Sequence, residues 1–186
     1  AAIRAFHERN GVSKVNSLVD YAFLEYCLRE DLNKTAKRAM AVLHPVKLII
    51  DNYPDDSSEE FTVENNPENP DDGVRTVSFS KELWIDQDDF MEVPAPKYFR
   101  LFPGNEVRLK SAYIVKCVGC DKDSDGNVIA VHCEYDKESR GGNPADGRKI
   151  KSTIHWVDSK TAIDAELRLY DKLFTTEQPD LADCNY

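Results

Sequence analysis

The chain has 186 residues, of which 41% are hydrophobic, 10% aromatic and 31% charged, a composition typical of globular proteins and not of disordered or fibrous ones. Its length allows one or two domains with a real core. The longest apolar run, near Val46–Ile50, is interrupted by Lys47 and is far shorter than the ~18 residues of a membrane span. A formal net charge of −10 argues at first against a nucleic-acid partner.

The acidic side chains are concentrated in one part of the chain. Residues 51–92 carry fourteen acidic and two basic residues, whereas residues 1–50 carry eight basic and five acidic ones, and residues 93–186 carry fourteen basic and fifteen acidic ones. Segregated charge can leave one face attractive to phosphate even when the total is negative. The alternative is that each charged group is ordinary solvated surface.

Helices are predicted at the start of the chain, over residues 1–9 and about 17–30. In the second helix, apolar residues recur at spacings of three and four from Leu18 to Leu28, which gives one apolar stripe. Ser17, with Asp20 three residues later, is a candidate N-terminal cap. A short third helical segment, Lys34–Met40, is expected to follow, and Pro45 ends the helical region.

Beyond Pro45 the pattern changes to short runs typical of strands, bounded by Gly, Pro, Asn or Asp. The predicted strands are Val46–Asn52, Phe61–Val63, Val74–Phe79, Leu83–Ile85, Val107–Cys117, Val128–Tyr135, Ile150–Val157 and Ala165–Tyr170. Seven or eight short strands indicate an antiparallel barrel or sandwich. We therefore expect a mainly β protein with a small α-helical N-terminal part.

Two motifs resemble metal sites but lack essential parts. Asp121–Gly126 has the first half of a calcium loop, but His132 stands where a bidentate glutamate is required, so a hairpin turn is predicted instead. Cys117 and Cys120 have the spacing of half a zinc site, but the nearest further ligands, His132 and Cys133, are adjacent on a strand and point to opposite faces. No metal site is predicted.

The sequence contains no recognisable catalytic constellation. The four histidines lie far apart, and no P-loop, G-x-G-x-x-G, G-x-S-x-G or H-E-x-x-H motif occurs. Five irregularly spaced cysteines suit a reducing cytoplasm better than a disulfide framework. The first residues are neither a signal peptide nor an initiator methionine, and both ends are expected to be cuts in a longer chain.

A set of basic and aromatic side chains remains. Arg108 and Lys110 lie two apart on a predicted strand and therefore share a face. Guanidinium groups bind base edges and phosphates, and aromatic rings stack on unpaired bases, so this chemistry is typical of proteins that bind single-stranded RNA loops. The set comprises Lys34, Lys37, Arg38, Lys97, Tyr98, Phe99, Arg100, Arg108 and Lys110.

Several longer motifs, in this order, closely resemble the glutaminyl-tRNA synthetase family. They are Leu28–Asn33, Arg38–Val42, Pro45–Leu48, Trp84–Asp86 with Asp89 and Phe90, Tyr98 with Arg100 and Leu101, Glu106–Leu109, Pro144–Lys149, Ile154–Val157 and Leu167–Phe174. The resemblance covers nearly the whole chain. It implies the end of a helical subdomain at residues 1–44 and an anticodon-binding β-barrel region at residues 45–186. The implied fold is an antiparallel six-stranded barrel of the L25-like, glutaminyl-tRNA synthetase kind, largely complete, with a second barrel incomplete.

The resemblance also implies which residues contact the anticodon. Arg38 corresponds to an arginine placed against the middle base, and Asn33 to a contact next to it. Arg100 corresponds to the arginine associated with the third base, and Arg108 to the arginine associated with the first. The family binds these bases unstacked, each in a separate pocket.

Four positions depart from the family pattern. Lys97 stands where bacterial relatives often have glutamine, and Phe99 replaces a lysine. Lys110 replaces an arginine and is expected to contact phosphate, because an ammonium group does not reproduce a guanidinium fork at a base edge. Glu68 stands at an asparagine-like contact and is not expected to approach a phosphate.

The implied partner is the anticodon loop of a glutamine-accepting tRNA, and the implied intact enzyme attaches glutamine to tRNA using ATP and Mg. This part of it is expected to have no catalytic residue, cofactor or metal, and to be monomeric, cytoplasmic, free of membrane contact and joined to its own catalytic domain. The alternatives are a glutamyl-tRNA synthetase of eukaryotic or archaeal type, an L25-like ribosomal RNA-binding barrel, and a metal- or partner-binding β-module built on the acidic stretch.

Overall fold

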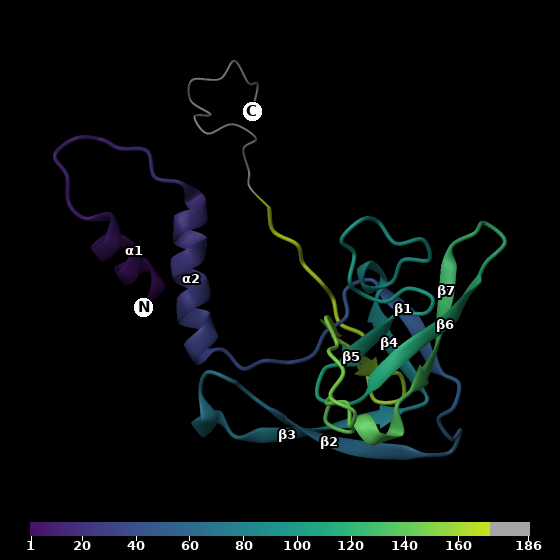
Figure 1. The fold of residues 1–186 in the computed structure, drawn as a ribbon. Helices are drawn as coiled ribbons and strands as arrows, with labels where there is room; N and C mark the ends of the chain where they lie inside the picture. Colours follow the sequence, from purple (N-terminus) through teal and green to yellow (C-terminus); the bar gives the residue numbers. More distant parts are fainter. Residues whose placement is uncertain (172–186) are drawn as a thin grey trace.

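The computed structural model describes residues 1–171, which form two helices, a curled β-sheet and a long β-hairpin (Figure 1). The helices are α1 (Ala2–Asn10) and α2 (Tyr21–Thr35). The strands are β1 (Pro45–Ile50), β2 (Ser58–Glu64), β3 (Val74–Ser80), β4 (Glu82–Asp86), β5 (Glu106–Leu109), β6 (Ile114–Lys122), β7 (Val128–Tyr135), β8 (Thr153–Ile154) and β9 (Val157–Asp158), with short 3₁₀ turns at Pro70–Asp72, Gln87–Asp89 and Lys137–Ser139. The prediction of a mainly β chain with a helical N-terminal part is confirmed.

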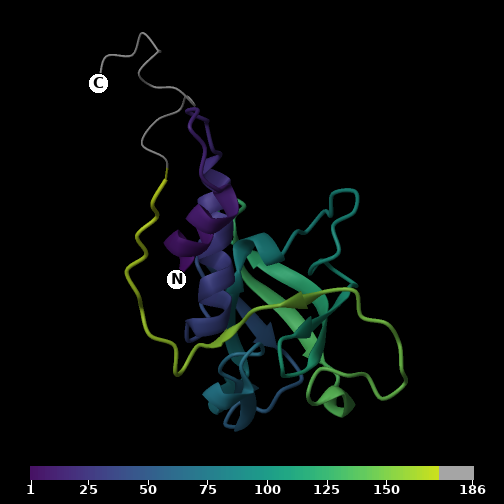
Figure 2. The same ribbon diagram turned by 90° about the vertical axis from the view of Figure 1, so that its left-hand side faces the viewer.

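The two helices pack on each other to one side of the sheet (Figure 1), and Figure 2 looks at them from that side. The rings of Phe6 and Phe23 lie 5.5 Å apart, and Arg9 Nη1 is 2.5 Å from Glu30 Oε2. Only Cys27 of α2 is buried, so most of the predicted apolar stripe stays exposed. Neither helix in residues 1–171 has the length and apolar character needed to cross a membrane.

Helix α2 begins and ends later than predicted. Asp20, not Ser17, is the N-cap, and its Oδ1 accepts a hydrogen bond from the backbone N of Ala22 at 2.9 Å. A carboxylate at this position satisfies an unpaired N–H and complements the positive end of the helix dipole. Ala36 already has extended backbone angles, so the predicted helical segment Lys34–Met40 is wrong beyond Thr35.

Seven strands form one sheet in the order β8-β5-β6-β7-β1-β4-β9. The two outer strands, β8 and β9, are separated in the chain only by His155 and Trp156. A single short segment therefore pairs with β5 at one edge and with β4 at the other. The sheet curls into a half-barrel as a result, and the core lies inside the curl (Figure 1).

The sheet is mixed, and the predicted antiparallel arrangement is wrong at two of its six junctions. Strands β1 and β7 pair in parallel, as do β5 and β8, whereas the other four junctions are antiparallel. Parallel neighbours need a long connection between them. Both parallel pairs join strands that are far apart in the sequence, where no hairpin signal can indicate the pairing.

Three predicted strands differ from the structure. The run Val107–Cys117 is split into β5 and β6 by a tight turn, in which Ser111 has φ 64° and Leu109 N donates to Tyr113 O at 2.8 Å. The run Ile150–Val157 contributes only the short β8 and the start of β9. The run Ala165–Tyr170 forms no strand. Residues 159–171 thus contain no strand, and the remainder of the predicted second barrel falls on residues 172–186, outside the described part of the chain.

Aromatic rings fill the centre of the core. Phe79 and Trp156 are fully buried, and their rings meet nearly at right angles with centroids 5.2 Å apart. Phe79 also contacts Tyr53, Phe61 and Tyr113 at 5.4–5.6 Å. Each such edge-to-face pair contributes about 0.5–1.5 kcal/mol beyond the burial of its surface.

The β2–β3 hairpin lies across the sheet and is anchored through Glu59 (Figure 1). The Glu59 carboxylate accepts hydrogen bonds from the hydroxyls of Tyr53 and Tyr113, both at 2.9 Å, and from Arg140 Nε at 3.2 Å. Arg140 also lies 4.6 Å from the centre of the Phe61 ring. The base of the hairpin is therefore fixed to the core, while its tip, residues 65–73, reaches the C-terminal end of α2.

His132 lies on the outer face of β7 between two carboxylates. Its Nδ1 is 2.8 Å from Asp51 Oδ1, and its Nε2 is 3.0 Å from Asp121 Oδ2. Hydrogen bonds to Asp51 and Asp121 raise the pKa of His132 above its usual range. A raised pKa in the folded state stabilises the fold below the unfolded-state pKa, and this stabilisation is lost as the pH rises through the folded-state pKa.

We therefore predict that His132→Gln flattens the pH dependence of stability. The free energy of unfolding of the wild type should fall as the pH rises from about 6 through the neutral range, by on the order of 1 kcal/mol or less because the imidazole is partly exposed. Urea denaturation at several pH values measures this, with the exposed His44→Gln as a control. If His132→Gln keeps the wild-type pH dependence, the two carboxylates do not act through this histidine.

Candidate nucleic-acid interface

The predicted site residues fall into two groups in the structure. Asn33 and Arg38 lie at the C-terminal end of α2, next to the hairpin tip. The other four lie on β5, just after it, or in the loop that precedes it: Lys97, Arg100, Arg108 and Lys110. We call the second group, together with Phe99, Lys151 and His155 beside it, the β5 edge.

Arg38 is folded back onto the end of α2. Its Nη2 donates to the carbonyl oxygen of Asn33 at 2.9 Å and lies 3.7 Å from Glu68 Oε1 in the hairpin tip. The last carbonyls of a helix have no intrahelical partner and carry the negative end of the helix dipole. Arg38 therefore provides a hydrogen-bond donor for one of these carbonyls, that of Asn33, and Asn33 takes part in this contact through its backbone and not its side chain.

Arg100 is oriented by a buried carboxylate. The side chain of Asp89 is only 4% exposed and pairs with Nη1 of Arg100, whose own side chain is 54% exposed. Leu101 N donates to the carbonyl of Asp89 at 2.9 Å, which fixes the two segments side by side. A buried carboxylate without a partner would be costly, so this pair holds one side of the guanidinium while the other side faces solvent.

Arg108 lies on the outer face of β5, between the buried Val107 and Leu109. Its Nε donates to the carbonyl of Gly142, and its Nη1 donates to Thr153 Oγ1 at 3.3 Å. A Cβ built on Gly142 would come within 2.7 Å of Arg108 Cδ. The side chain is therefore packed closely on the backbone of the loop that precedes β8.

Lys110 and His155 continue the same outer face. The parallel register places Arg108 opposite Thr153, so Lys110 and His155 come next on their two segments. Lys110 N donates to the carbonyl of Ile154 at 3.1 Å. Partial burial, together with the charges of Lys110 and Arg100, lowers the pKa of His155.

An exposed aromatic ring and a further cation complete the β5 edge. Lys151 Nζ lies 4.9 Å from the centre of the Phe99 ring, and Phe99 is 50% exposed. Lys151 is not a member of the basic and aromatic set that the sequence analysis singled out. Its place beside the Phe99 loop follows from the parallel pairing of β5 with β8, which no local pattern reveals.

Lys97 occupies the corner of a turn in the same loop. Tyr98 N donates to the carbonyl of Ala95 at 3.0 Å, with Pro96 and Lys97 between them, and Lys97 has φ 67°. This is the arrangement of a type II turn, whose third position usually holds glycine. The turn keeps Lys97 exposed at the corner, two residues before Phe99.

The loop that carries Gly142 is held by Arg148. The guanidinium of Arg148 contacts Glu106 Oε2 at 3.0 Å, Asp136 Oδ2 at 2.8 Å and Asp146 Oδ2 at 3.0 Å. Hydrogen bonds to these three carboxylates raise the pKa of Arg148. Because Glu106 is the first residue of β5, this network ties the loop to the strand that presents Arg108.

The other motifs serve the fold. Asp123 Oδ1 accepts hydrogen bonds from Asp125 N at 3.0 Å and Asn127 N at 2.8 Å, which confirms the predicted hairpin turn. Cys133 is buried while His132 faces outward, as expected for neighbours on a strand. Within residues 1–171, no group of three or more histidine, cysteine, aspartate or glutamate side chains is arranged to hold a metal ion.

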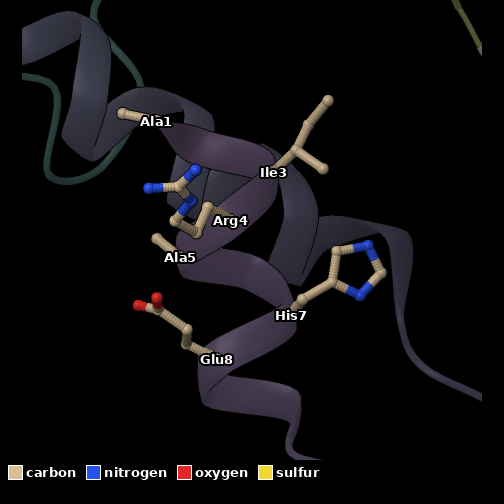
Figure 3. A pocket seen from close by; sticks show the side chains of 6 residues that line it. All are labelled: Ala1, Ile3, Arg4, Ala5, His7 and Glu8. Carbon is tan, nitrogen blue, oxygen red and sulfur yellow. The ribbon is translucent and has the colours of Figure 1, made fainter.

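A pocket lies beside α1. All six residues that line it belong to the first eight residues of the chain: Ala1, Ile3, Arg4, Ala5, His7 and Glu8. Figure 3 shows these side chains on two sides of the helix instead of converging on one point. The pocket is therefore a surface groove along a helix and contains none of the predicted site residues.

Comparison with known proteins places the chain in a family. Residues 36–136 match the model described as the anti-codon binding domain of class I tRNA synthetases (E and Q), and residues 153–185 match a second model with the same description. The chain belongs to this family. The first match contains Arg38, Lys97, Arg100, Arg108 and Lys110, so these five cations lie inside an anticodon-binding domain of the class I E and Q type.

Curated relatives that match nearly the whole chain are glutamine–tRNA ligases. The ligase of Clostridium kluyveri is 55% identical over 177 residues, which are 95% of this chain and 32% of the relative. The ligases of Bradyrhizobium diazoefficiens and Clostridioides difficile are 52% and 54% identical, over 97% and 96% of this chain and 32% of each relative. The chain spans about a third of the length of these relatives. The resemblance to the glutaminyl-tRNA synthetase family is confirmed.

We predict that Gly142→Ala is more damaging than Gly141→Ala. Both glycines have positive φ, 86° and 87°, so alanine at either position strains the backbone by about 1 kcal/mol. At Gly142 the new Cβ also displaces Arg108 and costs its bond to the Gly142 carbonyl, about 1 kcal/mol more. Nothing lies within 4 Å of a Cβ at Gly141, which makes it the matched control. Equal losses in free energy of unfolding would contradict the close packing of Arg108 on this loop.

Proposed function

We propose that the chain is the anticodon-binding part of a glutamine–tRNA ligase and that it binds the anticodon loop of a glutamine-accepting tRNA. The main support is the β5 edge, where Arg100, Arg108 and Lys110 gather on one outer face of a domain that belongs to the anticodon-binding family. Attachment of glutamine to tRNA, with ATP and Mg, would take place in a catalytic domain joined to this part. The proposed ligase acts as a monomer in the cytoplasm.

The arginines suit this task because they are held before RNA arrives. Asp89 orients Arg100, and the Gly142 carbonyl with Thr153 orients Arg108. A guanidinium fixed in this way loses little conformational entropy when it binds a base edge or a phosphate. The exposed ring of Phe99 offers a stacking surface for an unpaired base.

We assign the residues to the anticodon as the family resemblance implies. Arg38 would contact the middle base, with Asn33 beside it, while Arg100 would contact the third base and Arg108 the first. Two lysines would supply further contacts, Lys110 to phosphate and Lys97 from the corner of its turn. The assignment divides recognition between the end of α2 and the β5 edge.

The proposed fold is a barrel of the L25-like, glutaminyl-tRNA synthetase kind, with the end of a helical subdomain at residues 1–44 and an anticodon-binding β-barrel region at residues 45–186 in which a second barrel is incomplete. Two features favour this over the alternatives. The family model covers both glutamate and glutamine enzymes, and the relatives quoted above are all named for glutamine. An L25-like ribosomal RNA-binding barrel has no need of the helical lead and its contact with the hairpin tip.

We predict base-specific losses when the arginines are removed. Arg38→Ala, Arg100→Ala and Arg108→Ala should each weaken binding of cognate tRNA in the complete protein by about 1–3 kcal/mol and relax discrimination at the middle, third and first base respectively. Equilibrium binding to cognate tRNA and to three single-base anticodon variants measures this, with the exposed Arg4→Ala as a control. Unchanged discrimination in a variant would refute the assignment of that arginine.

Binding should also weaken steeply with salt, because phosphate contacts release counterions. For single-stranded RNA the logarithm of the binding constant falls against the logarithm of salt concentration with a slope of about −0.7 per phosphate neutralised. Lys110→Ala should reduce the slope by about one such contact and leave discrimination among bases unchanged. A flat salt response in the wild type would count against the β5 edge as the RNA-binding surface.

A further inference from the structure

Asn66, in the hairpin tip, is a buried polar residue that contacts another element. It is 1% exposed, and its Nδ2 lies 3.1 Å from the carbonyl oxygen of Asn33 and 3.4 Å from that of Lys34, both in the last turn of α2. Its Oδ1 accepts a hydrogen bond from Glu68 N at 3.0 Å. That bond orients the amide, so the donor side faces the helix. Asn66 thus caps the C-terminal end of α2 from a distant part of the chain.

The same helix carbonyl also binds Arg38. The oxygen of Asn33 accepts from Asn66 Nδ2 at 3.1 Å and from Arg38 Nη2 at 2.9 Å. A carbonyl oxygen has two lone pairs and can accept both bonds at once. Glu68, two residues after Asn66, lies 3.7 Å from the same Nη2. The guanidinium is therefore held between the end of a helix and the tip of a hairpin.

Arg38 has no secondary structure to position it. Residues 36–42 form neither helix nor strand, so no ladder of backbone hydrogen bonds fixes this stretch. The contacts that hold the guanidinium are those to the Asn33 carbonyl and to Glu68, and Asn66 is bonded to both residues. A change at Asn66 would move the two supports of Arg38 relative to each other.

We propose that Asn66 is a positioning residue for Arg38. By capping α2 it keeps the hairpin tip and the helix end in register, and it thereby sets the guanidinium where an RNA base can be read. The amide of Asn66 is buried against the helix, so it acts through Arg38 and not by contact with RNA. This inference rests on the proposed function, because it takes Arg38 as the contact to the middle base.

The test compares two asparagines of the same tip in the complete protein. Asn66→Ala removes the cap, whereas Asn69→Ala removes a half-buried amide that bonds Asp72 within the tip, at 3.0 Å. We expect Asn66→Ala to weaken cognate tRNA binding roughly threefold to tenfold, the loss of about one hydrogen bond. Discrimination should fall at the middle base and stay unchanged at the first and third. Asn69→Ala should behave as the wild type.

A double-mutant cycle separates positioning from a general structural role. In an Arg38→Ala background, Asn66→Ala should have no further effect on middle-base discrimination, because the two residues act as one unit. The near-isosteric Asn66→Asp, which keeps the acceptor for Glu68 N but loses the donor, should reproduce the result of Asn66→Ala. Equal loss of discrimination at all three bases, or an unreduced effect in the Arg38→Ala background, would overturn the proposal.

Trypsin gives a measurement that needs no RNA. Cleavage after Lys37 and Arg38 should be faster in Asn66→Ala than in Asn69→Ala, because the segment loses its anchor. Equal cleavage rates would overturn the positioning role even if RNA binding changed. If Arg38→Ala alone leaves middle-base discrimination intact, the assignment of Arg38 fails instead, and the cleavage rates still decide whether Asn66 anchors this segment.

Discussion

Both edges of the main sheet are held by one stretch of six residues, Thr153–Asp158, and most of the structure depends on that constraint. Within it, Ile154 and Trp156 point into the core, while Thr153 and His155 face outward beside β5. Side chains alternate between the two faces of a strand, so one face of this segment closes the core and the other borders the basic surface. Trp156 Nε1 donates a hydrogen bond to the Lys110 carbonyl at 2.9 Å, which connects the buried side of the segment to the backbone of a basic residue. The cations of the β5 edge are therefore placed by the same packing that closes the fold.

The acidic excess is part of how the basic side chains are placed. Of the acidic stretch at residues 51–92, Glu59 anchors the hairpin to the core, Glu68 contacts Arg38, and Asp89 orients Arg100 from a buried position. Such carboxylates would not prevent the cations from binding RNA as proposed, because each occupies one side of a guanidinium with several donors and leaves the rest available. A net charge of −10 is thus compatible with an RNA-binding face. The relevant quantity is which donors remain exposed.

The sequence predicted those features of the fold and the site that depend on local patterns of residues. Periodicity gave both helices, most of the strands and the shared face of Arg108 and Lys110, and the family motifs gave the domain type. It could not show contacts made across long separations, such as Asn66 with a helix end 33 residues away or Arg108 with Gly142. The break in the run Val107–Cys117 was hidden because its apolar pattern continues through the turn at Ser111. The segment Ala165–Tyr170, in which apolar and charged residues alternate, also has the pattern of a strand, yet a strand forms only where another strand can pair with it.

Arg108 and Arg38 are held in place by different interactions, and this difference affects how an anticodon loop would be recognised. Arg108 stands on a strand whose inward neighbours are fully buried, so moving it requires disturbing the core. Arg38 stands on irregular chain and is held by a few polar contacts, each contributing about 1 kcal/mol. Under the proposed assignment, the first base meets an arginine on a strand of the sheet and the third base meets an arginine held by a buried carboxylate, whereas the middle base meets a joint between two elements. Changes in the hairpin tip would therefore alter reading of the middle base without touching the other two. Such separate control follows from placing Arg38 between the end of α2 and the hairpin tip, apart from the β5 edge.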